Sequence, residues 1–130
     1  GDILVLQNEI NLMPYIVDKA HSNGMFIVLN PSPFNEKLND VVAKFPKLDF
    51  VYFDANHTRK ATLSFFEICL QKTHKKTIFV FDDIYYSAEM ESAWNEIKKR
   101  DDVRLSIDLY HFGLVFFNTD LPKQDYIVEF

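Results

Sequence analysis

The sequence predicts a three-layer α/β/α sandwich built on a mainly parallel β-sheet, and three observations lead to that fold class. Four short apolar runs, rich in β-branched and aromatic residues, recur at residues 3–6, 26–29, 50–53 and 78–81. These runs do not alternate with polar residues, which is typical of strands covered by helices on both faces. The segments between them have helical spacing, and only the last part of the chain alternates as an antiparallel strand does.

The first two connecting segments each predict a helix. Residues 12–22 follow Asn11, a suitable N-cap, and stop before Gly24, which suits the left-handed conformation that closes many helices. Residues 35–45 repeat apolar side chains at helical spacing. Pro46 ends that pattern, because proline disfavours the helical conformation of the residue before it.

Two further helices are predicted after the third and fourth apolar runs. The segment from Thr58 to about Lys72 carries two adjacent apolar stripes at helical spacing. The last helix begins after Ser87, a good N-cap, and has Glu89 and Glu91 in its first turn. Basic residues 98–100 close it, as the helix dipole favours.

The end of the chain predicts an antiparallel edge. Residues 103–109 alternate apolar and polar side chains, and residues 112–117 follow with no room for a helix, so we expect the two segments to pair antiparallel. Residues 126–130 add a further edge strand, with a helical or frayed end as the alternative. Right-handed crossovers then give the first four strands the order 2-1-3-4 in a Rossmann- or flavodoxin-like sheet. No linker divides residues 1–130, which predicts one domain.

The composition is that of a globular chain and argues against several partners. Hydrophobic residues make up 48% and charged residues 25% of the 130 residues, and no apolar run approaches the ~20 residues that a membrane span needs. With 14 basic and 19 acidic residues the formal net charge is −5, and no basic stripe is present. Nucleic acid and membranes are therefore not expected partners. The single cysteine, Cys69, and the lack of a leader before Asp2 favour a reducing, cytoplasmic setting.

Glycine is scarce, and this excludes a common kind of nucleotide site. The three glycines are Gly1, Gly24 and Gly113, so neither a Gly-x-Gly-x-x-Gly loop nor a phosphate-binding loop can be written.

Polar residues follow each predicted parallel strand, and these strand ends form the candidate site. Ligands of open α/β sheets bind beyond the carboxyl ends of the strands, so we expect these side chains to converge. They are Asn8, Glu9, Asn30, Asp54, Asn56, His57, Asp82 and Asp83. The alternative is that short polar residues simply end strands and cap the following helices.

Other reactive residue types give weaker indications. His57 is a ligand or general base in one interpretation and an ordinary loop residue in the other. Cys69 falls on a predicted buried stripe and is expected to act as a small hydrophobic residue. The other three histidines are not spaced as metal ligands are, and we expect them at the surface. Three lysines before the fourth strand are expected to form a turn exposed to solvent. Tyr85 and Tyr86 line a cleft or pack over a helix start. The histidines are His21, His74 and His111, and the lysines are Lys72, Lys75 and Lys76.

Two parts of the chain resemble two different families. Residues 2–37 resemble the ribokinase (carbohydrate kinase) family, in Leu-Gln-Asn-Glu at residues 6–9 and Leu-Asn-Pro-Ser-Pro at residues 29–33. Residues from about 48 to 130 are similar to the C-terminal half of class I S-adenosylmethionine-dependent methyltransferases, in residues 48–57, 79–84, 87–90, 93–94, 106–109 and 113–117. The junction falls between about residues 34 and 46, which divides the chain into about residues 1–40 and 41–130.

These resemblances imply two alternative functions. The first is an engineered chimera, a structural scaffold without catalysis and without a cofactor, because the kinase-like part lacks that family's anion hole, base and ATP loops. The second is an S-adenosylmethionine-dependent O-methyltransferase. In that case the cation-dependent members of the family imply that Asp54, Asp82 and Asp83 bind Mg, Ca or Mn, and Asn8, Glu9 and Asp54 are the candidate cofactor-binding residues. A third expectation is self-association through the edge formed by residues 112–130.

Overall fold

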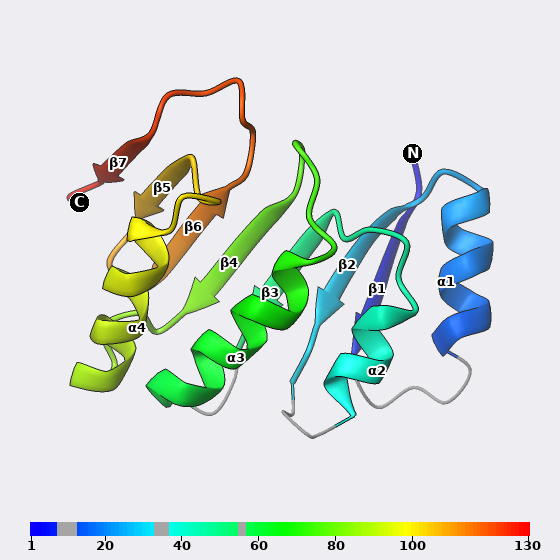
Figure 1. Ribbon diagram of the computed structural model, residues 1–130, viewed down its shortest axis with the longest axis horizontal. Helices are drawn as coiled ribbons and strands as arrows, with labels where there is room; N and C mark the ends of the chain where they lie inside the picture. The colour runs from blue at the N-terminus through cyan, green and yellow to red at the C-terminus, as the bar shows by residue number, and fades with distance from the viewer. Residues whose placement is uncertain (8–12, 33–36, 55–56) are drawn as a thin grey trace.

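The computed structural model describes residues 1–7, 13–32, 37–54 and 57–130, which form one seven-stranded sheet with four helices (Figure 1). The strand order is β1-β2-β3-β4-β6-β5-β7. Only β6 runs antiparallel to its neighbours. The strands are β1 Ile3–Gln7, β2 Phe26–Asn30, β3 Phe50–Phe53, β4 Ile78–Asp82, β5 Leu105–Asp108, β6 Phe112–Phe116 and β7 Gln124–Ile127. The helices are α1 Met13–Ser22, α2 Leu38–Ala43, α3 Arg59–Leu70 and α4 Ala88–Lys99. The mixed α/β, mostly parallel fold class is thus confirmed.

The helix ends follow from local sequence chemistry. The hydroxyl of Thr58 accepts a hydrogen bond from the amide of Ala61 at the start of α3 (3.3 Å), and Ser87 accepts one from Met90 at the start of α4 (3.2 Å). Each bond satisfies an amide that the first helical turn leaves without a partner. Gly24 has a φ of +67° just after α1, so its predicted left-handed conformation is confirmed. Asn11 lies outside the described residues.

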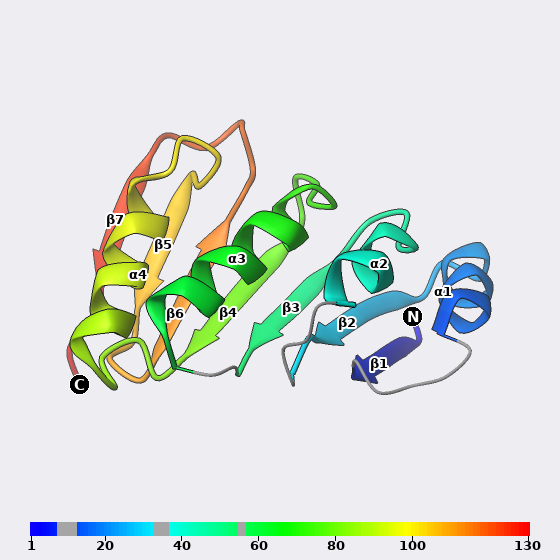
Figure 2. The same cartoon turned by 60° about the horizontal axis from the view of Figure 1, so that its bottom comes forward.

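The predicted strand order 2-1-3-4 is wrong, and so is the three-layer arrangement. β1 pairs with β2 and lies at one edge, so β1 to β4 follow one another in chain order. When every crossover joins neighbouring parallel strands with the same hand, the helices collect on one face. Helices α2, α3 and α4 do lie together on one face, and α1 lies at the β1 end (Figures 1 and 2).

The strands are therefore buried on one face only, which corrects the prediction that both faces are covered. The core fills the space between the sheet and the helices. Its sheet residues include Leu6, Ile27, Leu29, Val51, Phe53, Phe79, Phe81 and Val115, and its helix residues include Val17, Ala20, Leu38, Val42, Phe65, Phe66, Cys69, Trp94 and Ile97. The opposite face carries half-buried or exposed apolar side chains. These are Ile3, Val5, Phe26, Val28, Phe50, Tyr52, Ile78, Val80, Leu105, Ile107, Leu114 and Phe116.

The C-terminal strands agree with the prediction in part. β5 pairs antiparallel with β6, as predicted. β7 is an edge strand that begins at Gln124 and runs parallel to β5. It lies on the side of β5 that β6 leaves unpaired. All four β7 residues are exposed. Self-association through this edge stays a prediction.

No described helix is long and apolar enough to cross a membrane. A cytoplasmic location stays a prediction.

The buried Cys69 thiol gives a first testable prediction. Cys69 is fully buried, as predicted, and burial raises the pKa of its thiol from 9.0 to about 12. Because the thiolate is the nucleophile, we expect iodoacetamide to leave Cys69 unmodified in the native protein and to alkylate it in denaturant. Mass spectrometry of the two reactions measures this. Native alkylation at the denatured rate would contradict the buried placement.

Candidate functional site

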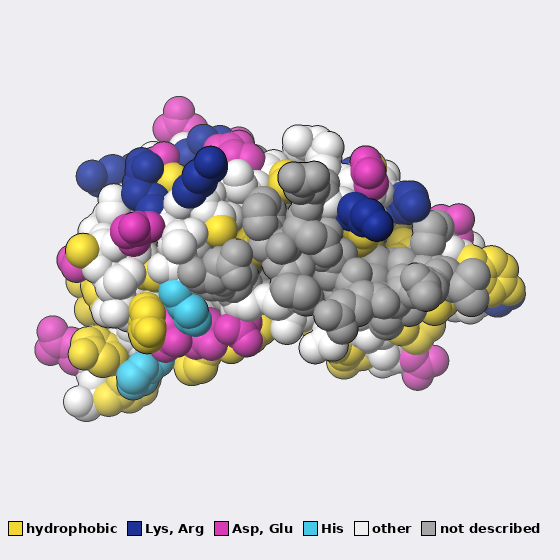
Figure 3. Space-filling model, turned by 90° about the horizontal axis from the view of Figure 1, so that it is seen from below, with side chains coloured by type: hydrophobic (Ala, Val, Ile, Leu, Met, Phe, Trp, Pro, Cys, Tyr) yellow, Lys and Arg dark blue, Asp and Glu magenta, His cyan; other side chains and the backbone are white. Residues whose placement is uncertain are grey.

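The carboxyl ends of β1 to β4 form one edge of the sheet, which we call the carboxyl edge. Seen from this side, acidic and histidine side chains lie next to each other on the part of the surface that the structure describes (Figure 3). Asp54 directly follows β3, Asp82 ends β4, and Asp83 follows it. Parallel strands β3 and β4 are direct neighbours, which explains why carboxylates from two separate segments meet here.

Tyr52 lies within reach of the charges of all three carboxylates. Burial raises the pKa of the Tyr52 phenol to about 12, helped by a hydrogen bond to Asp82 and by the negative charges of Asp82, Asp54 and Asp83. A neutral phenol that donates to a carboxylate is favoured over a second negative charge beside it. Tyr52 therefore remains a hydrogen-bond donor at neutral pH. Asp54 and Asp82 lie at the ends of paired strands, and the charge of Asp83 also acts on Tyr52. That the three carboxylates act together in one site stays a prediction. Tyr52 was not singled out from the sequence.

His57 lies beside this cluster in a strained loop. Its Nε2 is 4.0 Å from Oδ2 of Asp83, and its ring centroid is 4.7 Å from that of Tyr86. Its Nδ1 is buried without a hydrogen-bond partner among the described residues. His57 and Asp83 have φ values of 43° and 53°, a left-handed conformation that non-glycine residues adopt at a cost. The neighbouring fold therefore holds the imidazole and this carboxylate in place at the carboxyl edge.

The other predicted strand-end residues contribute less. Asn30 is half-buried and its Oδ1 accepts a hydrogen bond from the amide of Ser32, so its side chain closes the turn that ends β2. Asn8, Glu9 and Asn56 lie outside the described residues. No three His, Cys, Asp or Glu side chains in the described part of the chain form a group that could hold a metal ion. Metal binding by Asp54, Asp82 and Asp83 stays a prediction.

A second polar centre, which the sequence pattern did not reveal, lies at Asp108. This residue is 2% exposed, and its carboxylate accepts hydrogen bonds from the Tyr85 hydroxyl (2.5 Å), the Trp94 indole (3.1 Å) and the Tyr110 amide (2.9 Å). Burial opposes its ionisation, but the bonds from Tyr85, Tyr110 and Trp94 outweigh burial and lower the pKa of Asp108. The only signal in the sequence was a carboxylate at an alternate position of an apolar strand.

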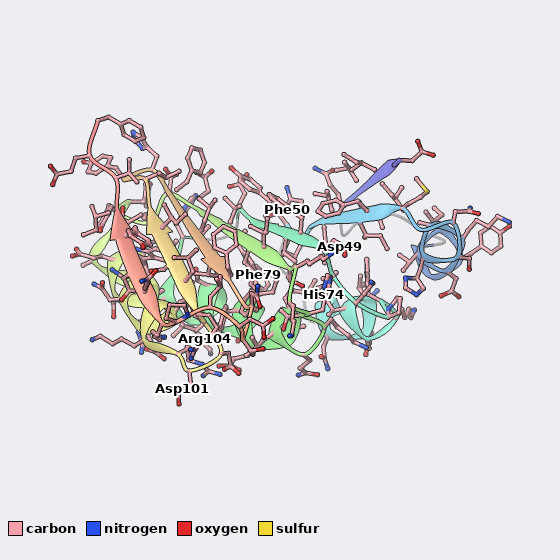
Figure 4. The ribbon with its side chains drawn as sticks, turned by 90° about the horizontal axis from the view of Figure 1, so that it is seen from above. Asp49, Phe50, His74, Phe79, Asp101 and Arg104 are labelled. Atoms are coloured by element: carbon pink, nitrogen blue, oxygen red, sulfur yellow. The ribbon has the colours of Figure 1, made fainter. Side chains whose placement is uncertain are left out.

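Most of the remaining histidines and lysines lie where they were expected. His21 and His111 are exposed. His74 is instead half-buried, because its Nε2 lies 2.8 Å from Oδ1 of Asp49 at the amino ends of the strands (Figure 4). The other Asp49 oxygen accepts from the amide of Ile27, so this pair ties β2 to the turn before β4. Lys75 forms an exposed ion pair with Asp120, as a solvated turn would.

Comparison with known families gives one match. A family model described as a methyltransferase domain matches residues 14–84, more than half of the 130-residue chain. No curated protein matches the sequence.

This match also bears on the two resemblances drawn from the sequence. It supports the methyltransferase resemblance and extends it to α1, β2 and α2. The matched range includes residues 34–46, where a junction between two families was expected. The ribokinase resemblance and the interpretation as an engineered chimera have no support from it.

Proposed function

The chain belongs to the methyltransferase domain family, and from this premise we propose that it binds S-adenosylmethionine at the carboxyl edge and transfers its methyl group. The observation that carries this proposal is the position of Asp54, Asp82 and Asp83 directly after or at the end of the neighbouring strands β3 and β4, where the charges of all three act on Tyr52. S-adenosylmethionine contains a positively charged sulfonium, an ammonium group and two ribose hydroxyls. Carboxylates suit all of these groups, through charge attraction and as hydrogen-bond acceptors.

The proposal gives the carboxylates and their neighbours roles in binding the cofactor and in accepting a proton. The exposed Asp54 and the half-buried Asp83 would bind the hydroxyls or balance the cationic centre. Tyr52 would keep Asp82 oriented by its hydrogen bond. When bound, the cofactor supplies a methyl group activated by the adjacent sulfonium. His57 is the candidate general base for an acceptor hydroxyl, and Asp83 would stabilise the imidazolium that forms.

The predicted metal is a separate part of this proposal. Carboxylate oxygens are the ligands that Mg and Ca prefer, and Asp54, Asp82 and Asp83 are the residues that the sequence offers for such an ion. In the described part of the chain these side chains do not form a group arranged to hold one, so binding would require them to move closer together. Asn8 and Glu9 remain candidate cofactor-binding residues from the sequence alone.

Titration of S-adenosylmethionine, followed by calorimetry and by the thermal midpoint, tests this proposal. A ligand that binds only the native state must raise the midpoint. The neutral thioether S-adenosylhomocysteine should bind more weakly, because the site attracts the sulfonium through its carboxylates. In Asp54→Asn we expect about a fivefold loss of S-adenosylmethionine affinity, since removal of one exposed charge costs about 1 kcal/mol.

Asp101→Asn is the matched control. Asp101 is also exposed, and it lies toward the amino ends of the strands (Figure 4). Its replacement should leave both affinities unchanged. If neither compound binds at millimolar concentration, with or without Mg, the proposed function is wrong.

A further inference from the structure

A cleft of about 940 Å³ lies on the surface beside the β5–β6 hairpin. Its walls come from the β4–α4 connection, from the hairpin and from the C-terminal residues that follow β7. Tyr85 lines this cleft, whereas its neighbour Tyr86 contacts His57 at the carboxyl edge. The cleft is therefore separate in its lining from the carboxylate cluster assigned to the proposed cofactor site.

Aromatic rings dominate the wall of the cleft. Tyr85 and Tyr110 lie with ring centroids 5.7 Å apart, and Phe112 is the third ring; we call these three residues the aromatic wall. Each is more than one third exposed, so ring faces are open to a ligand. Tyr110 has a φ of 68°, and its amide is bonded to Asp108, which fixes the strained hairpin turn that presents its ring.

The cleft is lined by two carboxylates, Asp108 and Glu129, and by no lysine or arginine. His111 also lines it, with its ring centroid 5.1 Å from that of Tyr110, and carries a positive charge only when protonated. No described basic side chain lies within ion-pair distance of Asp108, although its pKa is lowered and Lys98 attracts it from farther away. The Tyr85 hydroxyl donates to this carboxylate, which makes the Tyr85 ring richer in electrons on its open face. The wall thus combines electron-rich rings with a fixed negative charge behind them.

From this combination we propose that the cleft binds an organic cation, a compound with a quaternary or substituted ammonium group on an apolar body. Ring faces attract such cations through their quadrupole, and a desolvated ammonium gains most where its water is replaced by aromatic carbon. The carboxylate of Asp108 adds long-range attraction without forming a contact bond, since all three of its hydrogen bonds are made to protein groups. The inference concerns binding alone and does not depend on methyl transfer.

Choline and its neutral carbon isostere 3,3-dimethylbutan-1-ol are the probes, because they have the same shape and differ in charge. Trp94 is the only tryptophan, and its indole N–H donates to Asp108, so its single indole resonance in a ¹H–¹⁵N NMR spectrum reports on the cleft. We expect choline to shift this resonance at neutral pH without S-adenosylmethionine present. The isostere should bind at least about fivefold more weakly, which corresponds to about 1 kcal/mol of cation–π attraction.

Two variants test the parts of the cleft. Phe112→Leu keeps an apolar side chain but removes one ring, and should weaken choline binding several-fold. Phe26→Leu is its matched control, because both phenylalanines are 39% exposed strand residues and Phe26 lies on β2, away from the cleft. Glu129→Gln removes an exposed charge without disturbing the buried network and should weaken choline more than the isostere.

Three outcomes would overturn the inference: neither probe binds at millimolar concentration, the isostere binds as tightly as choline, or Phe26→Leu lowers affinity as much as Phe112→Leu. None of them bears on S-adenosylmethionine binding, which has its own variants at Asp54 and Asp101.

Discussion

Replacing Gly113 with alanine should lower the free energy of unfolding by about 1–3 kcal/mol, the cost of overfilling a packed core. Gly113 begins the buried side of β6, and a Cβ there would lie 2.7 Å from two ring carbons of Trp94. The indole cannot move aside easily, since it is 1% exposed, lies 6.1 Å from the Phe81 ring and is bonded to Asp108. Chemical denaturation followed by far-ultraviolet circular dichroism measures the change, because this signal is also present in variants without Trp94.

A control and a double variant make this prediction specific. Gly1→Ala adds the same methyl group where no atom lies within 4 Å, and should leave stability unchanged. If the clash with the indole is the cause, Trp94→Phe should make Gly113→Ala less costly, because the smaller ring leaves room for the methyl group. Equal costs of Gly113→Ala in both backgrounds would show that the loss has another origin.

The sequence predicted those parts of the fold that depend on local chemistry. The strand positions follow from short apolar runs, and the starts of α3 and α4 follow from Thr58 and Ser87, whose hydroxyls bond within their own first turn. The strand order, in contrast, does not follow from local chemistry. Whether β3 lies beside β1, as predicted, or beside β2, as observed, depends on contacts between distant segments, and the apolar runs fit either neighbour equally well.

The same distinction applies to the candidate site. The sequence was enough to predict that Asp54 and Asp82 lie at the same edge of the sheet, because both stand at the carboxyl ends of parallel strands and such ends share one edge. The contact of His57 with Tyr86 could not, since it joins two loops. Asp108 was missed because alternation in β5 shows that two faces differ, but not which face the helices cover. In the structure the polar face of β5, with Ser106 and Asp108, is the buried one.

Removal of the buried Asp108 carboxylate is the second change that we expect to lower stability strongly. Asp108→Ala should lower the free energy of unfolding by about 2–4 kcal/mol at neutral pH, because the Trp94 indole and the Tyr110 amide would lose the acceptor they share, and each unsatisfied donor costs about 1–3 kcal/mol. Asp102→Ala is the matched control. Asp102 is half exposed and forms only a surface ion pair with Arg100, so its loss should change stability by no more than about 0.5 kcal/mol.

The pH dependence of this difference identifies its cause. The pKa of Asp108 is lowered, so the ionised carboxylate stabilises the native state above the ordinary value of 3.8, and this stabilisation is lost as the pH falls through the lower, folded value. The difference between wild type and Asp108→Ala should therefore shrink in acid. At the alkaline end, the hydrogen bond to Asp108 raises the pKa of Tyr85 from 10.0 to about 12, so the bond is complete below pH 10.0 and is lost as the pH rises through about 12. Urea denaturation of both proteins across this range measures the two limits. A difference that stays constant in acid would mean that Asp108 stabilises the hairpin by packing and not by its charge.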